Sequence, residues 1–228
     1  MAMKGGTMPE EFVSRSWSRP SVPGFQGQHV TVSRLNPDAD IDDLYDVSHR
    51  KEEFERLWTY MGYGPFPDRD AMHRWLTSLK DSQDPLFYSV YSRDLRRKAG
   101  MISILNIVPD MGRAELGHIW YSPLSQKTRV NTEVTFLFLR YLFDTLHYRR
   151  VEWKCDNQNE ASKRAALRMG FQHEGTFRKH MIVKGRNRDT AWFSILDEEW
   201  PALKSNFERY LTTPGLSLTE MNRNLTTK

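Results

Sequence analysis

The segment from Ser125 to Asn131 is the first part of the chain whose residues and position could support chemistry. It reads Ser-Gln-Lys-Thr-Arg-Val-Asn and joins an apolar run ending at Tyr121 to a run with helical spacing. A turn from strand to helix gathers unpaired backbone N–H groups at the positive end of a helix dipole. The pattern predicts a phosphate-binding site. Its structural alternative is a polar turn with a helix cap.

Other catalytic patterns are absent from the sequence. It contains no Cys-x-x-Cys, no His-Glu-x-x-His, no Walker-type glycine-rich loop and no Gly-x-Ser-x-Gly. The one cysteine, Cys155, lies in an apolar run, a setting typical of an inert core residue. We therefore expect no metal site, no serine hydrolase chemistry and no covalent acyl-enzyme. A single cysteine also excludes an internal disulfide and fits a reducing, cytoplasmic location.

The composition indicates one globular domain without a membrane or nucleic-acid partner. The 228 residues include 33 Lys and Arg against 29 Asp and Glu, and the net charge of +4 is not concentrated in one block. No window approaches the roughly 18 consecutive apolar residues of a membrane span. The pI of about 9.1 keeps a nucleic-acid-binding domain open as an alternative, for which binding should weaken steeply with salt.

Apolar periodicity predicts the elements that position these residues. Strands are expected at residues 29–35, 86–91, 100–108, 114–121, 149–155, 171–183 and 190–196. Helices are expected within 41–60 and at 68–79, 131–146, 159–169 and 198–211. Turn residues between the second, third and fourth strands predict an antiparallel meander. The strand-helix-strand order then places the fifth strand parallel to the fourth.

The chain is expected to have three parts. Residues 1–28, with several Gly and Pro, form an irregular N-terminal tail or strap. Residues 29–212 form a single domain, and residues 213–228 form a flexible C-terminal tail.

Two motifs make the sequence similar to the GNAT superfamily of acetyl-CoA-dependent N-acetyltransferases, in particular its ribosomal-protein-acetyltransferase-like (Rim-type) branch. The superfamily's pyrophosphate loop reads Gln/Arg-x-x-Gly-x-Gly/Ala before a helix. Gln126 matches its first position, whereas Arg129 and Asn131 replace the two small residues. The second motif is an Asn-x-x-Ser helix start, here Asn159 and Ser162, followed by Gly-Phe and Glu-Gly at residues 170–175.

The resemblance implies an α/β (α+β) fold. We expect a GNAT-like mixed sheet of about seven strands, with an antiparallel N-terminal meander, splayed parallel strands 4 and 5, and flanking helices. It also implies acetyl-CoA as co-substrate. Lys127 and Arg129 would compensate for the missing glycines by supplying positive charge. The implied coenzyme-binding residues are Ile119, Trp120, Tyr121, Gln126, Lys127, Thr128, Arg129, Val130, Asn131, Thr132, Asn159 and Ser162.

The same resemblance implies the catalytic groups. Glu115 lies 126 − 115 = 11 positions before Gln126, the separation of the general base in histone-type members. A carboxylate there can deprotonate an ammonium, and a bulge near Gly117 could free N–H groups to polarise the thioester carbonyl. Without the resemblance, a strand Glu is usually a surface ion-pair partner. His118 is the reserve base, three positions along the strand.

Ser162 is the implied general acid, and its alternative role is a hydrogen bond within its own helix. The second acidic residue of the Rim-type branch falls on Met181, so this part of the pattern is missing, and the neighbouring His180 is a weaker replacement.

Two surface features are also interpreted from the sequence. Trp58, Tyr63 and Phe66 either form an acceptor pocket or cover the sheet. Residues 184–188 are expected to be a solvated hairpin tip.

The expected function is transfer of an acetyl group from acetyl-CoA to a primary amine in a ternary complex. The amine belongs to a small molecule, an amino acid or a peptide N-terminus, and the protein is a monomer or homodimer. The alternative is a catalytically inactive coenzyme A-binding regulatory module with the same fold.

Overall fold

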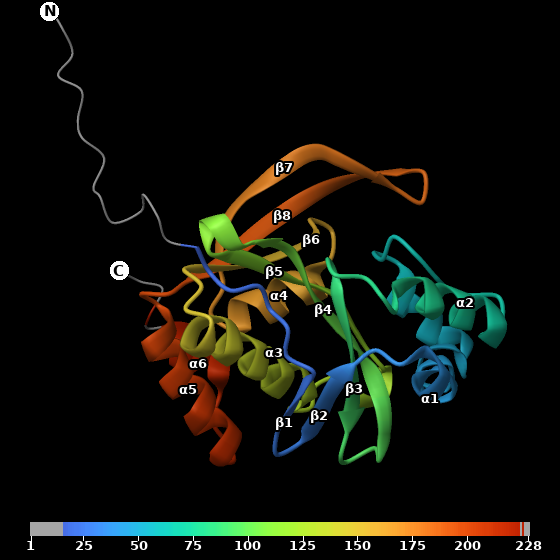
Figure 1. Cartoon of the computed structure of the whole chain (residues 1–228), viewed down its shortest axis with the longest axis horizontal. Helices are drawn as coiled ribbons and strands as arrows, with labels where there is room; N and C mark the ends of the chain where they lie inside the picture. The colour runs from blue at the N-terminus through green and yellow to red at the C-terminus, as the bar shows by residue number, and fades with distance from the viewer. Residues whose placement is uncertain (1–15, 224, 226–228) are drawn as a thin grey trace, which may run out of the picture.

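A single mixed sheet organises the molecule, and helices cover both of its faces (Figure 1). The computed structural model describes residues 16–223 and 225. The strand order is β1-β2-β3-β4-β5-β6-β8-β7. The strands are β1 (Gly24–Gln26), β2 (Val30–Arg34), β3 (Leu86–Ser92), β4 (Arg97–Val108), β5 (Arg113–Tyr121), β6 (Arg150–Asp156), β7 (Gln172–Val183) and β8 (Arg186–Leu196).

The predicted fold class is confirmed. Strands β2 to β5 form an antiparallel meander, β6 is parallel to β5, β8 is antiparallel to β6, and β7 is antiparallel to β8. The sheet has eight strands rather than about seven, because β1 lies in the segment expected to be irregular. Phe25 explains the extra strand: it pairs with Val32 and packs edge-on against Phe138, 4.9 Å between ring centroids. Residues 1–15 of the expected tail lie outside the described residues.

Two apolar layers hold the helices on opposite faces of the sheet. Alternate residues of a strand point to opposite faces, so Tyr88 and Ile102 belong to one cluster, whereas Phe87 and Met101 belong to the other. The helices are α1 (Pro37–His49), η2 (Glu52–Trp58), α2 (Arg69–Leu79), η3 (Pro109–Met111), η4 (Pro123–Ser125), α3 (Val130–Arg140), η5 (Tyr141–Thr145), α4 (Glu160–Arg168), α5 (Trp200–Thr212) and α6 (Leu218–Arg223).

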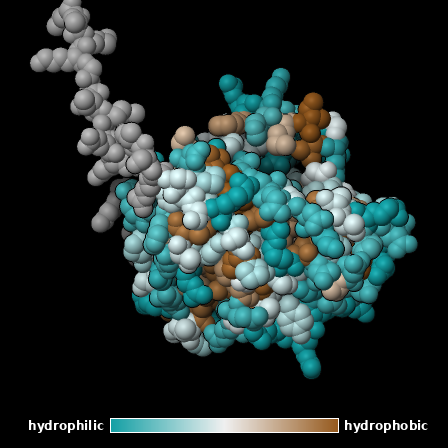
Figure 2. All heavy atoms as spheres, viewed as in Figure 1, coloured by the Kyte–Doolittle hydropathy of each residue, from teal (hydrophilic) through white to brown (hydrophobic). Residues whose placement is uncertain are grey.

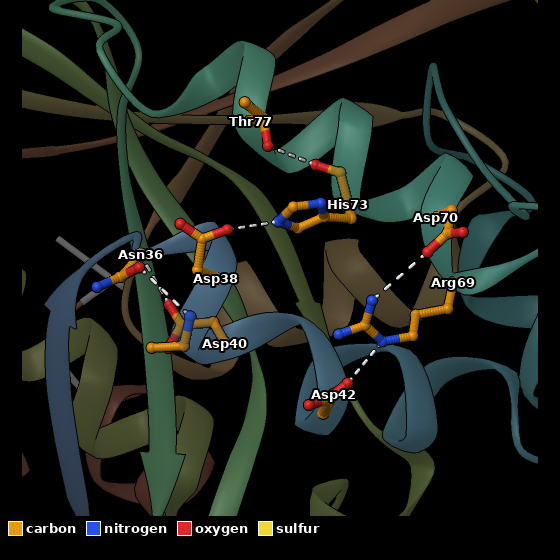
Figure 3. A network of polar contacts seen from close by, with 9 residues as sticks. Asn36, Asp38, Asp40, Asp42, Arg69, Asp70, His73 and Thr77 are labelled. Carbon is orange, nitrogen blue, oxygen red and sulfur yellow. Dashed lines mark hydrogen bonds and ion pairs between the residues drawn. The ribbon is translucent and has the colours of Figure 1, made fainter.

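Polar contacts connect α1 to α2 on the outside of one layer (Figure 3). The ring of His73 is 2.8 Å from Asp38, and the guanidinium of Arg69 donates to Asp42 over 2.6 Å. Exposed pairs of this kind contribute about 0–1 kcal/mol each. The buried side chains of Trp58 and Leu76 beneath them therefore stabilise the layer more than the ion pairs do.

The C-terminal segment differs from the expected flexible tail, because α6 packs on the domain. Leu218 is buried, and the side chain of Asn222 donates to the carbonyl oxygen of Arg168 over 3.0 Å while it accepts from Asn206. These contacts provide apolar burial and satisfied buried polar groups, neither of which local composition predicts. Within the described residues, no helix is long and apolar enough to cross a membrane.

Strands β5 and β6 separate after a short paired stretch, as expected for the splayed parallel pair. Their register runs from Arg113 opposite Arg150 to Leu116 opposite Trp153. Beyond this point β5 continues to Tyr121 and β6 to Asp156 without pairing to each other. The sheet therefore opens between two strands that begin side by side.

Candidate active site

Two cavities lie along helix α4, the smaller one between β5 and β6 and the larger one at the end of β5. The larger cavity has a volume of about 1010 Å³ and contacts Ala161, Arg164 and Arg168 of α4. The smaller cavity has a volume of about 380 Å³ and contacts Asn159 and Ser162 at the start of the helix. One long ligand lying along α4 could therefore reach both cavities.

The segment predicted to bind phosphate lines the larger cavity. Its contributing residues are Ser125, Gln126, Lys127, Thr128 and Asn131. Lys127 has a left-handed backbone, with φ +61°, which turns the chain into α3. The side chain of the N-cap residue Arg129 makes no capping hydrogen bond, and the Thr128 hydroxyl accepts from the Val130 N–H over 3.3 Å. The remaining N–H groups of the first turn keep the partial positive charge of a helix N-terminus.

Only one of the two side chains expected to supply positive charge, Lys127 and Arg129, lines the larger cavity. Lys127 lines the cavity, but the guanidinium of Arg129 donates to the carbonyl oxygens of Leu211 and Thr213, over 2.8 and 3.5 Å. The side chain of Arg129 therefore binds the end of α5. Only the backbone of Arg129 remains to contribute to the loop.

Two arginines of α4 line the larger cavity in its place. Arg164 and Arg168 are four positions apart and thus share one face of the helix. Arg168 donates to the Thr132 hydroxyl over 2.7 Å, and burial lowers the pKa of its guanidinium. The sequence analysis missed both residues, although their i, i+4 spacing on the helix after the Asn-x-x-Ser motif was a usable signal.

The other residues expected to bind the coenzyme do not all line the same cavity. Tyr121 lines the larger cavity and Ile119 the smaller one. Trp120 points to the opposite side of the sheet, where its ring lies 5.1 Å from that of Trp58. Val130 is buried in the apolar cluster beneath α3.

Glu115 faces the smaller cavity as a buried carboxylate with two partners. Only 4% of the residue is exposed. Its Oε2 atom accepts from the Asn106 amide over 2.6 Å and lies 2.5 Å from the Lys154 ammonium. Within the described residues, no hydrogen bond or ion pair reaches its Oε1 atom. Burial raises the pKa of Glu115, while the charge of Lys154 opposes this rise.

Two irregularities in the pairing of β4 with β5 bring Asn106 and His118 close to Glu115. The pairing of β4 with β5 shifts between Met101 and Ser103 and again between Leu105 and Val108. Asn106, with φ +48°, lies in the second shift and reaches Glu115, and His118, with φ +50°, lies opposite the first. The expected bulge near Gly117 is thus present, and it lets His118 line the same cavity as Glu115.

His118 is a neutral imidazole in this environment. Burial lowers its pKa to about 4. Its Nδ1 atom lies 3.2 Å from the Tyr63 hydroxyl, and the two rings stack with 5.7 Å between centroids. Tyr63 also lines the smaller cavity, whereas Trp58 is buried and Phe66 packs against it. The three aromatic residues therefore divide between lining the cavity and covering the sheet.

Ser162 connects α4 to β6 at the floor of the smaller cavity. Its hydroxyl accepts from the Trp153 indole over 3.0 Å, and its backbone N–H donates to the Asn159 side chain over 3.0 Å. The hydroxyl thus bonds across to the sheet. Burial raises the pKa of the nearby Cys155 thiol, which keeps it protonated.

The β7–β8 hairpin forms the outer wall of the smaller cavity, and Figure 2 shows apolar side chains on this hairpin at the top of the view. His180, Met181 and Arg188 line the cavity. Lys184, near the tip, donates to the Trp58 carbonyl oxygen over 2.7 Å. Residues 184–187 are exposed, as expected for a solvated hairpin tip, whereas Arg188 is only partly exposed and lines the cavity. The contact of Lys184 folds the hairpin back over η2.

The donor groups do not suggest a metal. Within the described residues, no three His, Cys, Asp or Glu side chains come together in a way that could hold a metal ion.

Comparisons with known proteins agree with this geometry. The family model described as "Acetyltransferase (GNAT) domain" matches residues 29–172. A crystal structure of a GCN5-related N-acetyltransferase from Brucella melitensis superposes with a TM-score of 0.88 at 39% identity, covering 92% of this chain and 99% of that one.

Two further proteins carry names that refer to ribosomal proteins. The chain is 25% identical over 183 residues to YdaF of Bacillus subtilis, provisionally named a ribosomal N-acetyltransferase, covering 78% of this chain and 96% of that protein. The ribosomal-protein-S5-alanine acetyltransferase from Vibrio fischeri shares the fold, with a TM-score of 0.61 at 16% identity, over 78% of this chain and 98% of that one.

The family match spans more than half of the residues, and it includes the splayed strands, the loop before α3 and the start of α4. The chain belongs to the GNAT family of N-acetyltransferases.

Proposed function

We propose that the protein transfers the acetyl group of acetyl-CoA to a primary amine by direct attack in a ternary complex. The observation that carries this proposal is the position of the two cavities along α4, one at the end of β5 and the other within the β5–β6 opening. One is lined by cations and a helix N-terminus, and the other contains a buried carboxylate.

The residues of the larger cavity suit the phosphates of coenzyme A. The N–H groups at the start of α3 can donate to the pyrophosphate, and Lys127, Arg164 and Arg168 add positive charge. The pantetheine arm would then extend along α4 between β5 and β6, and its thioester would supply the acetyl group in the smaller cavity.

Glu115 is the proposed general base. The acceptor arrives as an ammonium ion and cannot attack until it loses a proton. The Oε1 atom can accept this proton directly or through water, because the contacts of Glu115 within the described residues use only Oε2. The nitrogen then bonds to the carbonyl carbon and releases its second proton to solvent as the carbon–sulfur bond breaks, giving an amide and the coenzyme thiolate. The Ser162 hydroxyl is the proposed proton donor to the thiolate, and it regains a proton from solvent.

Release of free thiol from acetyl-CoA, measured with a panel of amino acids, peptides and polyamines, tests the proposal. The name of YdaF favours a protein or peptide acceptor, so peptides with free N-termini should be tried first. The expected result is amine-dependent thiol release with one acetyl group added to the acceptor mass. Coenzyme binding without turnover of any amine would instead support the inactive regulatory module.

A further inference from the structure

Arg188 is a cation in the smaller cavity that the proposed chemistry leaves unused. It lies on β8, lines the cavity and is only partly exposed. Its Nε atom donates to the Thr190 hydroxyl over 3.1 Å. No carboxylate of the described part of the chain lies within ion-pair distance of its guanidinium.

Several other partly buried cations of the sheet are paired with carboxylates, whereas Arg34 contacts a carbonyl oxygen and the Tyr88 ring. Arg97 contacts Asp43 and Asp46, Arg150 contacts Glu174, and Lys154 contacts Glu115. A partly desolvated charge without a counter-charge is unfavourable, so an unpaired arginine in a cavity favours an anionic ligand.

The nearby acid, Asp156, does not neutralise Arg188. It lines the same cavity, but it accepts from the Gln158 backbone over 2.8 Å and makes no ion pair with Arg188. The next anion along the cavity, Glu115, is already paired with Lys154.

The register of β6 and β8 relates Arg188 to the proposed base. Lys154 pairs with Trp192 and Asp156 with Thr190, and directly paired residues present their side chains on one face. The Lys154 ammonium lies 4.1 Å from the centre of a Trp192 ring and 2.5 Å from Glu115. The guanidinium of Arg188 lies beside Thr190. Thr190 is one two-residue step along β8 from Trp192, which is a distance of about 7 Å.

We propose that Arg188 binds a carboxylate of the amine acceptor, so that the protein prefers acceptors with an acidic group several bonds from the reacting nitrogen. The inference rests on the proposed function. The planar guanidinium can donate two parallel hydrogen bonds to one carboxylate, and this geometry distinguishes a carboxylate from an amide of the same shape.

Matched peptides provide the test. Short C-terminally amidated peptides would carry a single Asp at position two, three or four, and each would be compared with its Asn counterpart by thiol release. At the best position, we expect the Asp peptide to have at least about tenfold higher kcat/KM, through KM more than through kcat. Arg188→Gln should remove this preference, and Arg188→Lys should retain part of it.

Arg186→Gln is the matched control, because Arg186 is exposed on the same hairpin and does not line the cavity. It should keep the full preference, and thermal unfolding should confirm that each variant is folded. Equal turnover of Asp and Asn peptides by the unaltered protein would overturn the inference and leave acetyl transfer intact. Absence of turnover with every amine would remove the proposed function and the inference together.

Discussion

The two cavities hold their charged groups in opposite ways. In the larger cavity, Lys127 and Arg164 extend from a loop and a helix surface, and backbone N–H groups add to the positive field. In the smaller cavity, Glu115 is buried and paired with Lys154, and His118 is partly buried. The larger cavity combines several cations and a helix N-terminus, whereas in the smaller cavity burial shifts the pKa of single groups.

This difference explains how the larger cavity keeps a positive field although Arg129 and Asn131 replace the two small residues of the loop before α3. A field made by several cations and a helix N-terminus tolerates the loss of any one contributor, so Arg129 can hold α5 instead. A buried base has no such reserve, because its protonation depends on a few fixed neighbours. We therefore expect substitutions in the smaller cavity to have larger effects than substitutions in the larger one.

The largest effect is expected for Glu115→Gln. Removal of the proposed base should lower kcat by roughly 100- to 10,000-fold, measured by thiol release at saturating acetyl-CoA. The substitution leaves the Lys154 charge unpaired, so a Glu115→Gln, Lys154→Met double variant should be compared with it by thermal unfolding.

Glu152→Gln is the control for this experiment. Glu152 is also buried and pairs in register with Glu115 on the neighbouring strand, but it does not line the cavity. If both variants lost activity equally, the effect would come from the buried charge network and not from proton transfer.

A smaller effect is expected from His118, as a dependence of stability on pH. Its pKa is about 4 in the folded protein against 6.5 for the reference group, so the unfolded chain binds the proton more readily between these values. The free energy of unfolding should therefore fall as the pH drops through this window. This one group should account for about 2 kcal/mol of the loss between about pH 7 and about pH 5.

Urea unfolding at both pH values would measure this contribution, and His118→Gln should show a correspondingly weaker dependence on pH. Identical pH dependence in the two proteins would mean that the imidazole is not shielded as the structure indicates. An acid limb of kcat/KM that disappears only in the His118 variant would identify His118, instead of Glu115, as the base.

The smallest effects are expected at the larger cavity. Lys127→Ala should raise the dissociation constant for coenzyme A about three- to tenfold, because it removes one of several cations near the phosphates. Arg129→Ala should change that constant by less than about twofold but lower the melting temperature, since its side chain binds the end of α5.

Calorimetric titration would measure both constants, with Lys51→Ala as a control because Lys51 is exposed and remote from the cavity. A larger loss of affinity in Arg129→Ala than in Lys127→Ala would restore the role first expected for Arg129.

The sequence by itself determined the fold class, the parallel β5–β6 pair, the polar segment before α3 that lines the larger cavity, and the strand that carries Glu115. These features depend on local information: apolar periodicity, the order of strands and helices, and two motifs at fixed spacing. The same information also placed Ser162 and Asn159 at the start of α4.

Only the tertiary structure decided which side chains meet. Asn106 and Lys154 reach Glu115 from two different strands, Arg129 turns to α5, and Arg188 enters the smaller cavity from a distant hairpin. Bulges and long-range strand pairing set these positions, and single-residue register shifts leave little trace in local composition. Burial is the largest cause of the pKa shifts of Glu115, His118 and Cys155, and it depends on the whole packed domain.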